Sequence, residues 1–288
     1  MTADPISFVK GHGTGNDFVI LTDLTGALDL TTSRVAALCD RRRGIGADGV
    51  LVATRTAARR EVADQAAAAE FFMDYRNADG SVAQMCGNGA RVFVAHLREL
   101  GLIEPGSLAI ATRGGTRAVE LGMSGEISVD MGPPEFLQED LTVRPCEGTG
   151  PGFPAQGVLM PNPHAVTWVD SLDQAGALLD SPLVNPGDTF PEGVNVEFVR
   201  VLAERHVALR VFERGVGETL SCGTGACAAA VATLRRAGEQ PTGQHVRVDV
   251  PGGRLDVVWR PDGNVELRGP VAVVARGTID PIWWERNV

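Results

Sequence analysis

The chain carries little positive charge. Of its 288 residues, 26 are Lys or Arg and 36 are Asp or Glu, which gives a formal net charge of −10. A negative protein is repelled by polyanions, so we expect no nucleic acid and no membrane surface as a partner. No apolar run approaches the ~20 residues of a membrane span, and Met1 to Lys10 do not pair a basic segment with an apolar one. We therefore expect a cytoplasmic protein.

Cysteine and histidine are scarce, with five of each. An odd number of cysteines without a Cys-x-x-Cys pair does not fit the disulfide framework of a small secreted protein. The histidines form no metal-ligand spacing and are scattered over the chain at His12, His96, His164, His206 and His245. The glycine runs 11–15 and 44–46 match neither a dinucleotide fingerprint nor a Walker motif. We expect no metal and no nucleotide.

Glycine is abundant, at 35 residues, and short β-like runs recur along the chain. They are predicted at residues 18–21, 50–53, 71–75, 119–121, 207–212 and 255–259. Helices are predicted at 32–40, near 172–179, and directly after Cys86 and Cys222. The segment 54–70 has no sharp apolar stripe and indicates a solvated helical insertion or a mobile loop. The Pro and Gly of 145–163 predict a connection or a binding loop. Strands outnumber helices, so we expect an α+β fold.

An internal repeat is the most informative feature. Cys86-Gly87-Asn88-Gly89-Ala90 recurs 136 residues later as Cys222-Gly223-Thr224-Gly225-Ala226. Each copy leads into a run that ends in basic residues and a glycine, as the C-terminus of a helix often does. The spacing is nearly half the chain. It predicts two similar domains, each with one cysteine at a helix start.

A cysteine at a helix N-terminus lies in the positive end of the helix dipole, near unpaired backbone N–H groups. Both lower a thiol pKa from roughly 8.5, so we expect thiolate to be accessible near neutral pH. The neighbouring glycines let the backbone approach a ligand, and the N–H groups of such a turn suit a carboxylate. A single Cys-Gly-x-Gly would more often be a buried turn, but the duplication favours chemistry. Cys39, Cys146 and Cys227 lack this setting and are interpreted as structural.

A second symmetry accompanies the first. Asn77 lies nine residues before Cys86, and Glu213 lies nine residues before Cys222. Each follows a β-like run, so both would point toward the crevice beside a helix start. Alone, Asn77 would be a turn residue and Glu213-Arg214 a solvated pair.

The chain resembles the diaminopimelate epimerase family. The resemblance rests on motifs that occur in order along nearly the whole sequence: Gly15-Asn16-Asp17-Phe18, Arg43-Gly44-Ile45-Gly46-Ala47-Asp48, Asn77-Ala78-Asp79-Gly80-Ser81, the Cys86 repeat with Arg91, Pro161-Asn162-Pro163-His164, Gly193-Val194-Asn195-Val196-Glu197, Glu213-Arg214-Gly215 and the Cys222 repeat. Together they are specific, whereas one short glycine-containing match would be weak.

The resemblance implies two pseudo-symmetric domains, each a curved, mostly antiparallel sheet around a central helix. We expect an N-terminal domain of residues 1–132 plus 271–288, which carries Cys86, and a C-terminal domain of residues 133–270, which carries Cys222. The family interconverts LL- and meso-2,6-diaminopimelate for lysine and peptidoglycan precursor synthesis, without pyridoxal phosphate or metal. We therefore expect a homodimer that needs no cofactor and takes a small amino acid as substrate.

Residue roles follow from the same resemblance. Cys86 and Cys222 would be the acid–base pair that exchanges protons from opposite faces of one carbon, with His164 near one thiol and Glu213 near the other. The backbone of Gly87, Asn88, Gly223 and Thr224 would hold the carboxylate at the reacting carbon. The remaining polar groups of the substrate would be held by Asn16, Asn77, Asn162, Asn195 and Arg214. Two positions depart from the family pattern: Gly49 replaces a frequent glutamine, and Val92 a frequent cysteine.

Two other interpretations stay open. A racemase or epimerase for proline or hydroxyproline would share the paired cysteines, although Arg214 and the asparagines favour a longer substrate with a second charged end. A non-catalytic binding protein would use Cys86 and Cys222 as a structural disulfide, which thiol titration under reducing conditions would detect.

Overall fold

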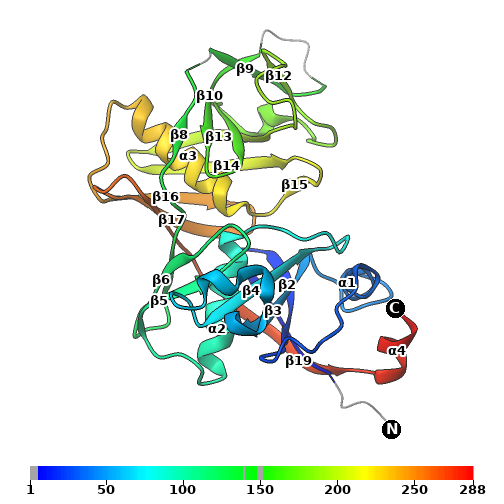
Figure 1. Cartoon of the computed structure of the whole chain (residues 1–288). Helices are drawn as coiled ribbons and strands as arrows, with labels where there is room; N and C mark the ends of the chain where they lie inside the picture. Colours follow the sequence, from blue (N-terminus) through cyan, green and yellow to red (C-terminus); the bar gives the residue numbers. More distant parts are fainter. Residues whose placement is uncertain (1–5, 139, 148–151, 288) are drawn as a thin grey trace. The chain divides into compact units, whose positions relative to one another are not determined.

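The chain forms two compact units. The computed structural model describes residues 6–138, 140–147 and 152–287. The first unit runs up to Val129 and resumes at Pro270, and the second unit is Asp130–Gly269. In Figure 1 the last strand β19 (Ala272–Ile279) and the helix α4 (Pro281–Arg286), both red, lie with the blue strands of the first unit. The end of the chain therefore completes the sheet in which it began.

The first unit is a mixed sheet with helices α1 (Thr32–Cys39) and α2 (Gly87–Glu99). Its strands pair in the order β19-β1-β2-β3-β4-β5-β6-β7. The pairs β2–β3 and β4–β5 are parallel, and the others are antiparallel. The strand bounds are β1 Ile6–Gly13, β2 Asn16–Thr22, β3 Gly49–Arg55, β4 Phe71–Asn77, β5 Gly106–Ala111, β6 Arg117–Leu121 and β7 Ile127–Asp130.

The second unit repeats this plan around helix α3 (Gly223–Arg236). Its strands pair in the order β12-β9-β10-β11-β13-β14-β16-β17-β18, while β8 pairs with β10 and β15 with β14. The strand bounds are β8 Glu135–Phe136, β9 Leu141–Arg144, β10 Phe153–Leu159, β11 Pro163–Trp168, β12 Leu183–Asn185, β13 Asn195–Ala203, β14 His206–Glu213, β15 Gly217–Thr219, β16 Gln244–Val250, β17 Gly253–Trp259 and β18 Val265–Arg268.

The two units share one strand pattern. Strands β1 to β7 of the first unit correspond in order and direction to β10, β11, β13, β14, β16, β17 and β18 of the second. In both units the cysteine-capped helix follows the fourth strand of this series and precedes the fifth. The duplication seen in the sequence is thus a duplication of the fold, and the predicted α+β class is confirmed.

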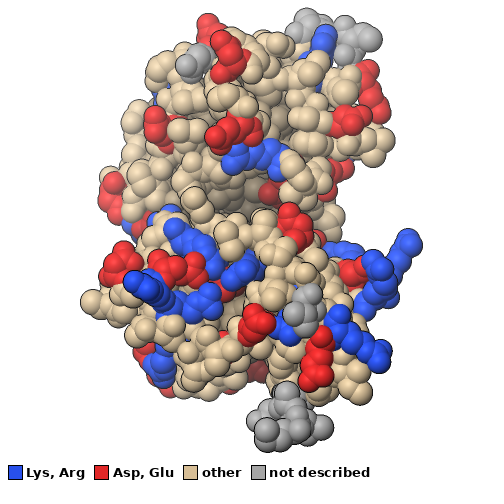
Figure 2. Space-filling view, turned by 45° about the vertical axis from the view of Figure 1, so that its right-hand side comes forward, with Lys and Arg blue, Asp and Glu red and all other residues tan. Residues whose placement is uncertain are grey.

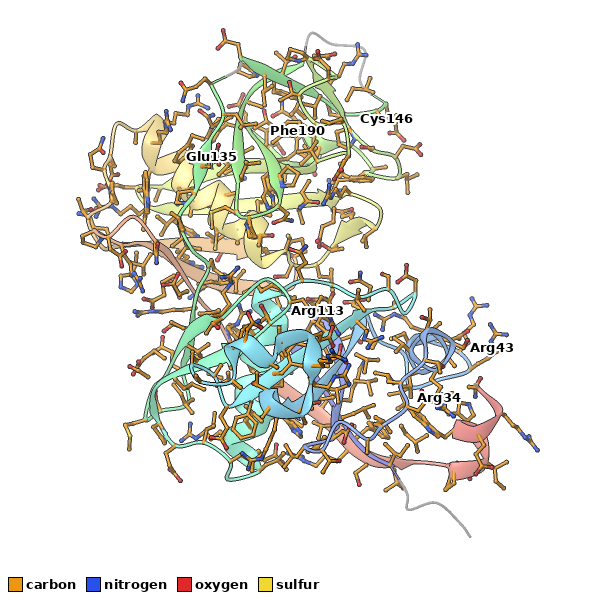
Figure 3. All side chains as sticks on the ribbon, viewed as in Figure 1. Arg34, Arg43, Arg113, Glu135, Cys146 and Phe190 are labelled. Atoms are coloured by element: carbon orange, nitrogen blue, oxygen red, sulfur yellow. The ribbon has the colours of Figure 1, made fainter. Side chains whose placement is uncertain are left out.

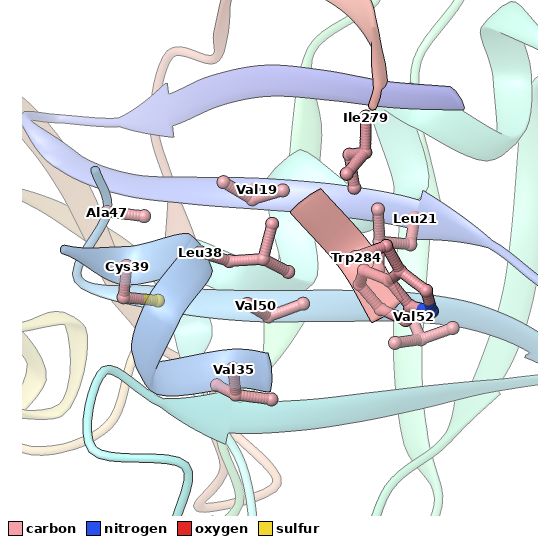
Figure 4. Close-up of a cluster of buried hydrophobic side chains, with 10 residues drawn as sticks. All are labelled: Val19, Leu21, Val35, Leu38, Cys39, Ala47, Val50, Val52, Ile279 and Trp284. Atoms are coloured by element: carbon pink, nitrogen blue, oxygen red, sulfur yellow. The ribbon is translucent and has the colours of Figure 1, made fainter. Parts of the chain in front are cut away.

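Helix α1 shows how the first sheet is covered. Thr31 caps it by accepting a hydrogen bond from the Arg34 backbone N–H at 3.2 Å. Its buried face joins the two central parallel strands and the C-terminal helix in one apolar cluster, drawn in Figure 4: Val19, Leu21, Val35, Leu38, Cys39, Ala47, Val50, Val52, Ile279 and Trp284. Arg34 lies 4.8 Å from the centre of the Trp284 ring, so a cation–π contact fixes α4 to α1.

The segment 54–70, expected as a solvated helical insertion or a mobile loop, is partly helical and mostly exposed, and it is anchored to the rest of the first unit. Strand β3 continues to Arg55, and the rest forms two 3-10 helices, η1 (Thr56–Ala58) and η2 (Arg60–Gln65). Val62 and Ala69 are buried against Phe72. Arg113, labelled in Figure 3, pairs with both Glu61, at 3.0 Å, and the buried Asp74, at 2.8 Å. Two apolar anchors and an ion-pair cluster therefore hold a segment whose composition alone suggested exposure.

Two expectations need correction. The segment 145–163 contains the seven-residue strand β10, although residues 148–151 lie outside the described part. Its glycine is accommodated because Gly157 packs directly under the Leu137 side chain. The helix expected near 172–179 is only a 3-10 turn, η3 (Leu172–Ala175), which ends at Gly176 with a φ of 71°. A left-handed residue stops a helix there.

The buried His96 of α2 makes the stability of the first unit depend on pH. Burial lowers the pKa of its imidazole from 6.5, with smaller opposed effects of Glu99 and Arg276. One ring nitrogen contacts Thr22 Oγ1 at 2.8 Å, and Nδ1 has no partner in the described residues. The unfolded chain therefore binds the proton more readily, so stability is complete above pH 6.5 and is lost as the pH falls below it.

We expect His96→Gln to reduce the loss of unfolding free energy between pH 7.5 and 5.5, because Gln can still contact Thr22 and does not titrate. Urea unfolding of both proteins at the two pH values measures the difference. An equal loss in wild type and variant would contradict the assignment.

Candidate functional site

In the first unit, Cys86 is the N-cap of α2. Its backbone is extended (φ −144°, ψ 120°), and its Sγ accepts a hydrogen bond from the Gly89 N–H at 3.3 Å. The helix ends as expected, with Gly101 at a φ of 67° after the basic last turn. Gly87 and Asn88 occupy the first two helical positions, where backbone N–H groups have no acceptor within the helix. The predicted helix start is confirmed.

Asn16, the first residue of β2, lies beside this thiol. The Cys86 thiol lies 3.6 Å from Asn16 Oδ1, and Asn88 Nδ2 donates to the same oxygen at 3.4 Å. Asn16 Nδ2 in turn donates to Asp48 Oδ2 at 2.9 Å. The buried Arg91 donates to Asn88 Oδ1 at 2.8 Å. Sequence positions 16, 86 and 88 therefore form one polar group around the thiol.

A charge network supports Asn16 from behind. Asp17 pairs with Lys10 at 2.5 Å and with Arg41 at 2.8 Å, and Arg41 also reaches Asp48 at 2.8 Å. Burial alone would raise the pKa of Asp17, but the hydrogen bonds from Arg41 and Lys10 outweigh it and hold this pKa far below its usual range. Asp17 is therefore a fixed anion that anchors this strand end.

In the second unit, Cys222 is the N-cap of α3 in the same manner. Its Sγ accepts from the Gly225 N–H at 3.4 Å and contacts Thr224 Oγ1 at 3.4 Å. Gly223 and Thr224 are the first two helical residues. Cys227 lies inside the helix and is buried. The second predicted helix start is also confirmed.

The predicted low thiol pKa is wrong for Cys222. Burial raises the pKa of Cys222 well above 9.0, and the charges of Glu213 and Glu197 raise it further. The hydrogen bonds from Thr224 and from the Gly225 N–H lower it, but they do not compensate. A helix N-terminus is worth at most ~2 kcal/mol, which is less than the desolvation of a fully enclosed thiolate. Cys222 is a thiol at neutral pH.

Glu213, the last residue of β14, is the direct partner of this thiol. Its side chain hydrogen-bonds to Cys222 and accepts from Thr219 Oγ1 at 2.5 Å. Burial raises the pKa of the Glu213 carboxyl above 4.5, against the opposing effects of these two bonds and of His164. A carboxyl group with a raised pKa beside a thiol can accept a proton and return it.

His164 lies in β11 and is fully buried, with 0% of its surface exposed. Its Nδ1 is 2.7 Å from Glu197 Oε1, and its Nε2 is 3.1 Å from Asn162 Oδ1. The parallel register of β11 and β13 places His164 beside Asn195, so Asn195 and Glu197 are on the same face as the imidazole. Asn195 Oδ1 accepts from the Arg214 backbone N–H at 2.9 Å.

The structure therefore gathers most of the predicted residues of the second unit around one helix start: Cys222, Gly223, Thr224, Glu213, His164, Asn162 and Asn195. The exposed Arg214 side chain donates only to the carbonyls of Glu192 and Gly193. Asn77 in the first unit closes a turn by donating to Ser81 Oγ at 3.0 Å.

At Gly49, strand β3 lies very close to strand β4. A Cβ at this position would lie 2.5 Å from the Arg76 carbonyl oxygen and 2.8 Å from the Tyr75 ring. Tyr75 packs edge-on against Phe18, with ring centres 5.9 Å apart. The glutamine that is frequent in the family has no room here because Tyr75 and the β4 backbone occupy the space.

Sequence reasoning missed Glu197, Arg91 and Tyr75 as members of these sites. The available signal for Glu197 was a charged residue two positions after Asn195 in an otherwise apolar strand.

The three other cysteines do not lie at either helix start. Burial raises the pKa of Cys39 to about 12, and Cys146, labelled in Figure 3, is exposed at the β9–β12 end of the second unit. Cys39, Cys146 and Cys222 are free thiols.

No three His, Cys, Asp or Glu side chains in the described ranges form a group that could hold a metal ion. On the face shown in Figure 2, acidic and basic side chains are interspersed and do not form a single basic surface. No helix among the described residues is long and apolar enough to cross a membrane.

Comparison with known proteins adds a family match. A family model described as diaminopimelate epimerase matches residues 8–137 and 157–274. The chain is 52% identical over 284 residues to a diaminopimelate epimerase from Streptomyces coelicolor, with 97% of each chain covered. It is 45% identical over 291 residues to one from Mycolicibacterium smegmatis, covering 96% of this chain and 98% of the relative.

Solved structures with low sequence identity share the fold. A Bacillus anthracis phenazine biosynthesis protein of the PhzF family has a TM-score of 0.70 at 17% identity and covers 96% of this chain and 100% of its own. A hydroxyproline epimerase from Agrobacterium vitis has a TM-score of 0.67 at 14% identity and covers 99% of this chain and 96% of its own. These likenesses support the two-unit, pseudo-symmetric fold.

The electrostatics of Cys222 lead to a thiol-reactivity test. We expect Glu213→Gln to speed alkylation of Cys222 by iodoacetamide at pH 8, because removing a negative charge lowers the pKa of the thiol and raises its thiolate fraction. Peptide mass spectrometry over time gives the rate for Cys222. Glu218→Gln, whose side chain pairs with Arg210 on the neighbouring strand, is the control. A rate for Glu213→Gln equal to or below wild type would contradict the charge effect.

Proposed function

Because the chain belongs to the diaminopimelate epimerase family, we propose that Cys86 and Cys222 invert the α-carbon of diaminopimelate by proton transfer on its two faces. The protein is an epimerase that interconverts the LL and meso isomers for lysine and peptidoglycan precursor synthesis. The observation that carries the residue assignment is the duplicated placement of the two thiols, each at the N-cap of the helix between the fourth and fifth strands of its unit.

The proton balance requires one thiolate and one thiol. The thiolate removes the α-proton and becomes a thiol, and the opposite thiol gives its proton to the carbanion and becomes a thiolate. After one turnover the two cysteines have exchanged states, so their titrations are coupled.

The helix starts provide the electrostatic part of the reaction. The backbone N–H groups of Gly87, Asn88, Gly223 and Thr224 suit the substrate carboxylate and the charge that develops beside it. Preorganised amides cost little reorganisation when this charge appears, so they act mainly on the transition state.

Two further groups serve the thiols. Glu213 takes the proton of Cys222 through their hydrogen bond when Cys222 must act as the base, and returns it when Cys222 must act as the acid. His164 is the proposed proton partner of the other thiol. In this way neither thiolate must persist uncompensated in a buried site.

The polar residues select a long substrate with a second amino-acid end. Asn16, Asn77, Asn162, Asn195 and Arg214 supply donors and acceptors for an ammonium and a carboxylate, whereas a cyclic amino acid such as proline offers neither at a distance. This favours diaminopimelate over the cyclic substrate of a proline or hydroxyproline racemase.

The two units are proposed as the functional domains, residues 1–132 with 271–288 and residues 133–270. Each domain contributes one thiol, so catalysis requires both to engage the same carbon, and closure would exclude water. Proton-exchanging thiols need a reducing compartment, which supports the cytoplasm as the location. Recovery of the protein in a secreted cell fraction would contradict that location.

The assembly is proposed to be a homodimer formed through the first unit. Among the described strands, β19 pairs only with β1, which leaves its other edge to solvent. Val274 and Val273 on this strand are 64% and 38% exposed. An edge strand with exposed valines suits pairing with a second identical strand.

The two-thiol mechanism predicts the fate of hydrogen in deuterated water. We expect product formed at low conversion to carry deuterium at the inverted carbon, because the thiol that protonates this face has exchanged with solvent. Recovered substrate should carry much less, since return of the proton to its original face regenerates unlabelled substrate. Chiral separation followed by mass spectrometry measures both. Largely unlabelled product would show a single base moving one hydrogen between faces.

Cysteine variants are the controls for this experiment. Cys86→Ala and Cys222→Ala should each abolish epimerisation with the fold intact, because a positioned proton donor or acceptor is worth ~10²–10⁴-fold. Cys39→Ala, in the apolar cluster of the first unit, should retain activity. Wild-type turnover in either of the first two variants would refute the assignment.

The dimer has its own test. We expect Val274→Lys to shift the protein from dimer to monomer in size-exclusion chromatography with light scattering, because a lysine charge opposes edge-to-edge pairing. Val216→Lys, at an exposed turn of the second unit, is the matched control and should stay dimeric. A monomeric wild-type protein would refute the dimer, and an unaffected Val274→Lys would move the interface elsewhere.

A further inference from the structure

The pair formed by His164 and Glu197 is buried without water access. Both side chains are 0% exposed, and Nδ1 lies 2.7 Å from Oε1. The second oxygen, Oε2, is also buried and has no hydrogen-bond partner among the described residues. A carboxylate enclosed in this way is costly unless a charged or donating partner compensates it. The packing of the sheet alone therefore does not explain why this polar pair is present.

The duplication provides a direct comparison. In the parallel pair β2–β3 the residue beside Gly49 is Phe18, and in the parallel pair β11–β13 the residue beside Asn195 is His164. Two positions further along, Leu51 corresponds to Glu197. The first unit thus has an apolar Phe–Leu pair at the place where the second unit has an ionic His–Glu pair.

Both pairs lie under the same part of the helix. A Cβ at Gly89 of α2 would lie 3.3 Å from Leu51 Cδ2 and 3.5 Å from Phe18 Cζ. A Cβ at the equivalent Gly225 of α3 would lie 2.6 Å from Glu197 Oε1. An apolar pair lies under the start of α2 at the position where the His164–Glu197 pair lies under the start of α3. We infer that the fold does not require charged side chains at this position. Buried ion pairs rarely stabilise a fold more than well-packed apolar residues.

The hydrogen-bond partners of the two ring nitrogens of His164 allow different protonation states. A carboxylate can only accept hydrogen bonds, so Nδ1 must keep its proton to bond to Glu197. The side chain of Asn162 has both an acceptor and a donor, so Nε2 can be protonated or unprotonated and still have a partner. The carboxylate thereby fixes one nitrogen and leaves the other able to change state, as in sites where a carboxylate sets the tautomer of a histidine.

We propose that Glu197 is a positioning residue that holds His164 in its Nδ1–H form and makes Nε2 the nitrogen that gains and loses a proton during epimerisation. This inference rests on the proposed function of His164. When Nε2–H gives its proton to a thiolate, the products are a thiol and a neutral Nδ1–H imidazole. The reverse step restores the thiolate and an imidazolium compensated by Glu197. Glu213 and Cys222 are the other titratable groups at this helix start.

The first test reads the imidazole directly. In protein labelled with ¹⁵N-histidine, the ¹⁵N shifts of wild-type His164 should show a proton on Nδ1. Glu197→Gln should retain the Nδ1–H form, because its amide oxygen accepts the same bond. Glu197→Leu, which copies Leu51, should lose this preference. An unprotonated Nδ1 in the wild-type protein would overturn the proposal.

The second test measures turnover. We expect Glu197→Leu to lower kcat about 10–100-fold with little change in KM, and Glu197→Gln to retain more activity than Glu197→Leu. Glu135→Gln, on the exposed start of β8, should behave as wild type. Wild-type kcat in Glu197→Leu would overturn the inference while leaving the proposed function intact. An inactive wild-type protein would refute the proposed function, and the NMR result would still decide the tautomer.

A double variant tests whether the pair serves the fold. His164→Phe with Glu197→Leu recreates the Phe18–Leu51 arrangement in the second unit, and its urea midpoint should equal or exceed that of the wild type. A clearly lower midpoint would show that the ionic pair is structural and would overturn the proposal.

Discussion

Each of the two thiols that we propose to react is the N-cap of its own helix, and the arrangement of both sites depends on this geometry. The sulfur accepts the N–H of the glycine three residues on, so its position is set by the backbone and not by rotamer preference alone. The same geometry directs the first amides of the helix toward the space in front of the thiol. Substrate carboxylate and proton donor are thereby arranged by a single turn of backbone, twice in one chain.

The two units differ in the polar side chains that surround their helix-capping cysteines. The first unit surrounds Cys86 with neutral amides braced by an Asp–Arg–Lys network, whereas the second surrounds Cys222 with two carboxylates and an imidazole. A duplicated scaffold can keep its strand order while the polarity of equivalent side chains changes, so the two helix starts differ in the polar groups that their own units supply.

The sequence predicted the fold class, both helix starts and the residues gathered at Cys222, because a repeat, an apolar helical face and a terminal glycine are local patterns. It failed where tertiary contacts overrule composition. The segment 145–163 was expected to be a connection or loop, but it contains β10 because β9 and β11 pair with this strand. The thiol pKa of Cys222 was missed for the same reason: the dipole effect is local, whereas burial and the charge of Glu197 come from distant parts of the chain.

Gly49 has a consequence for how such a chain can change over time. With the Arg76 carbonyl 2.5 Å and the Tyr75 ring 2.8 Å from where its Cβ would be, a glutamine cannot enter unless Tyr75 leaves and the strand shifts. Tyr75 packs on Phe18, and Phe18 lies under the helix that Cys86 caps. Positions 49 and 75 are therefore epistatic: an ancestor could exchange one only after or together with the other.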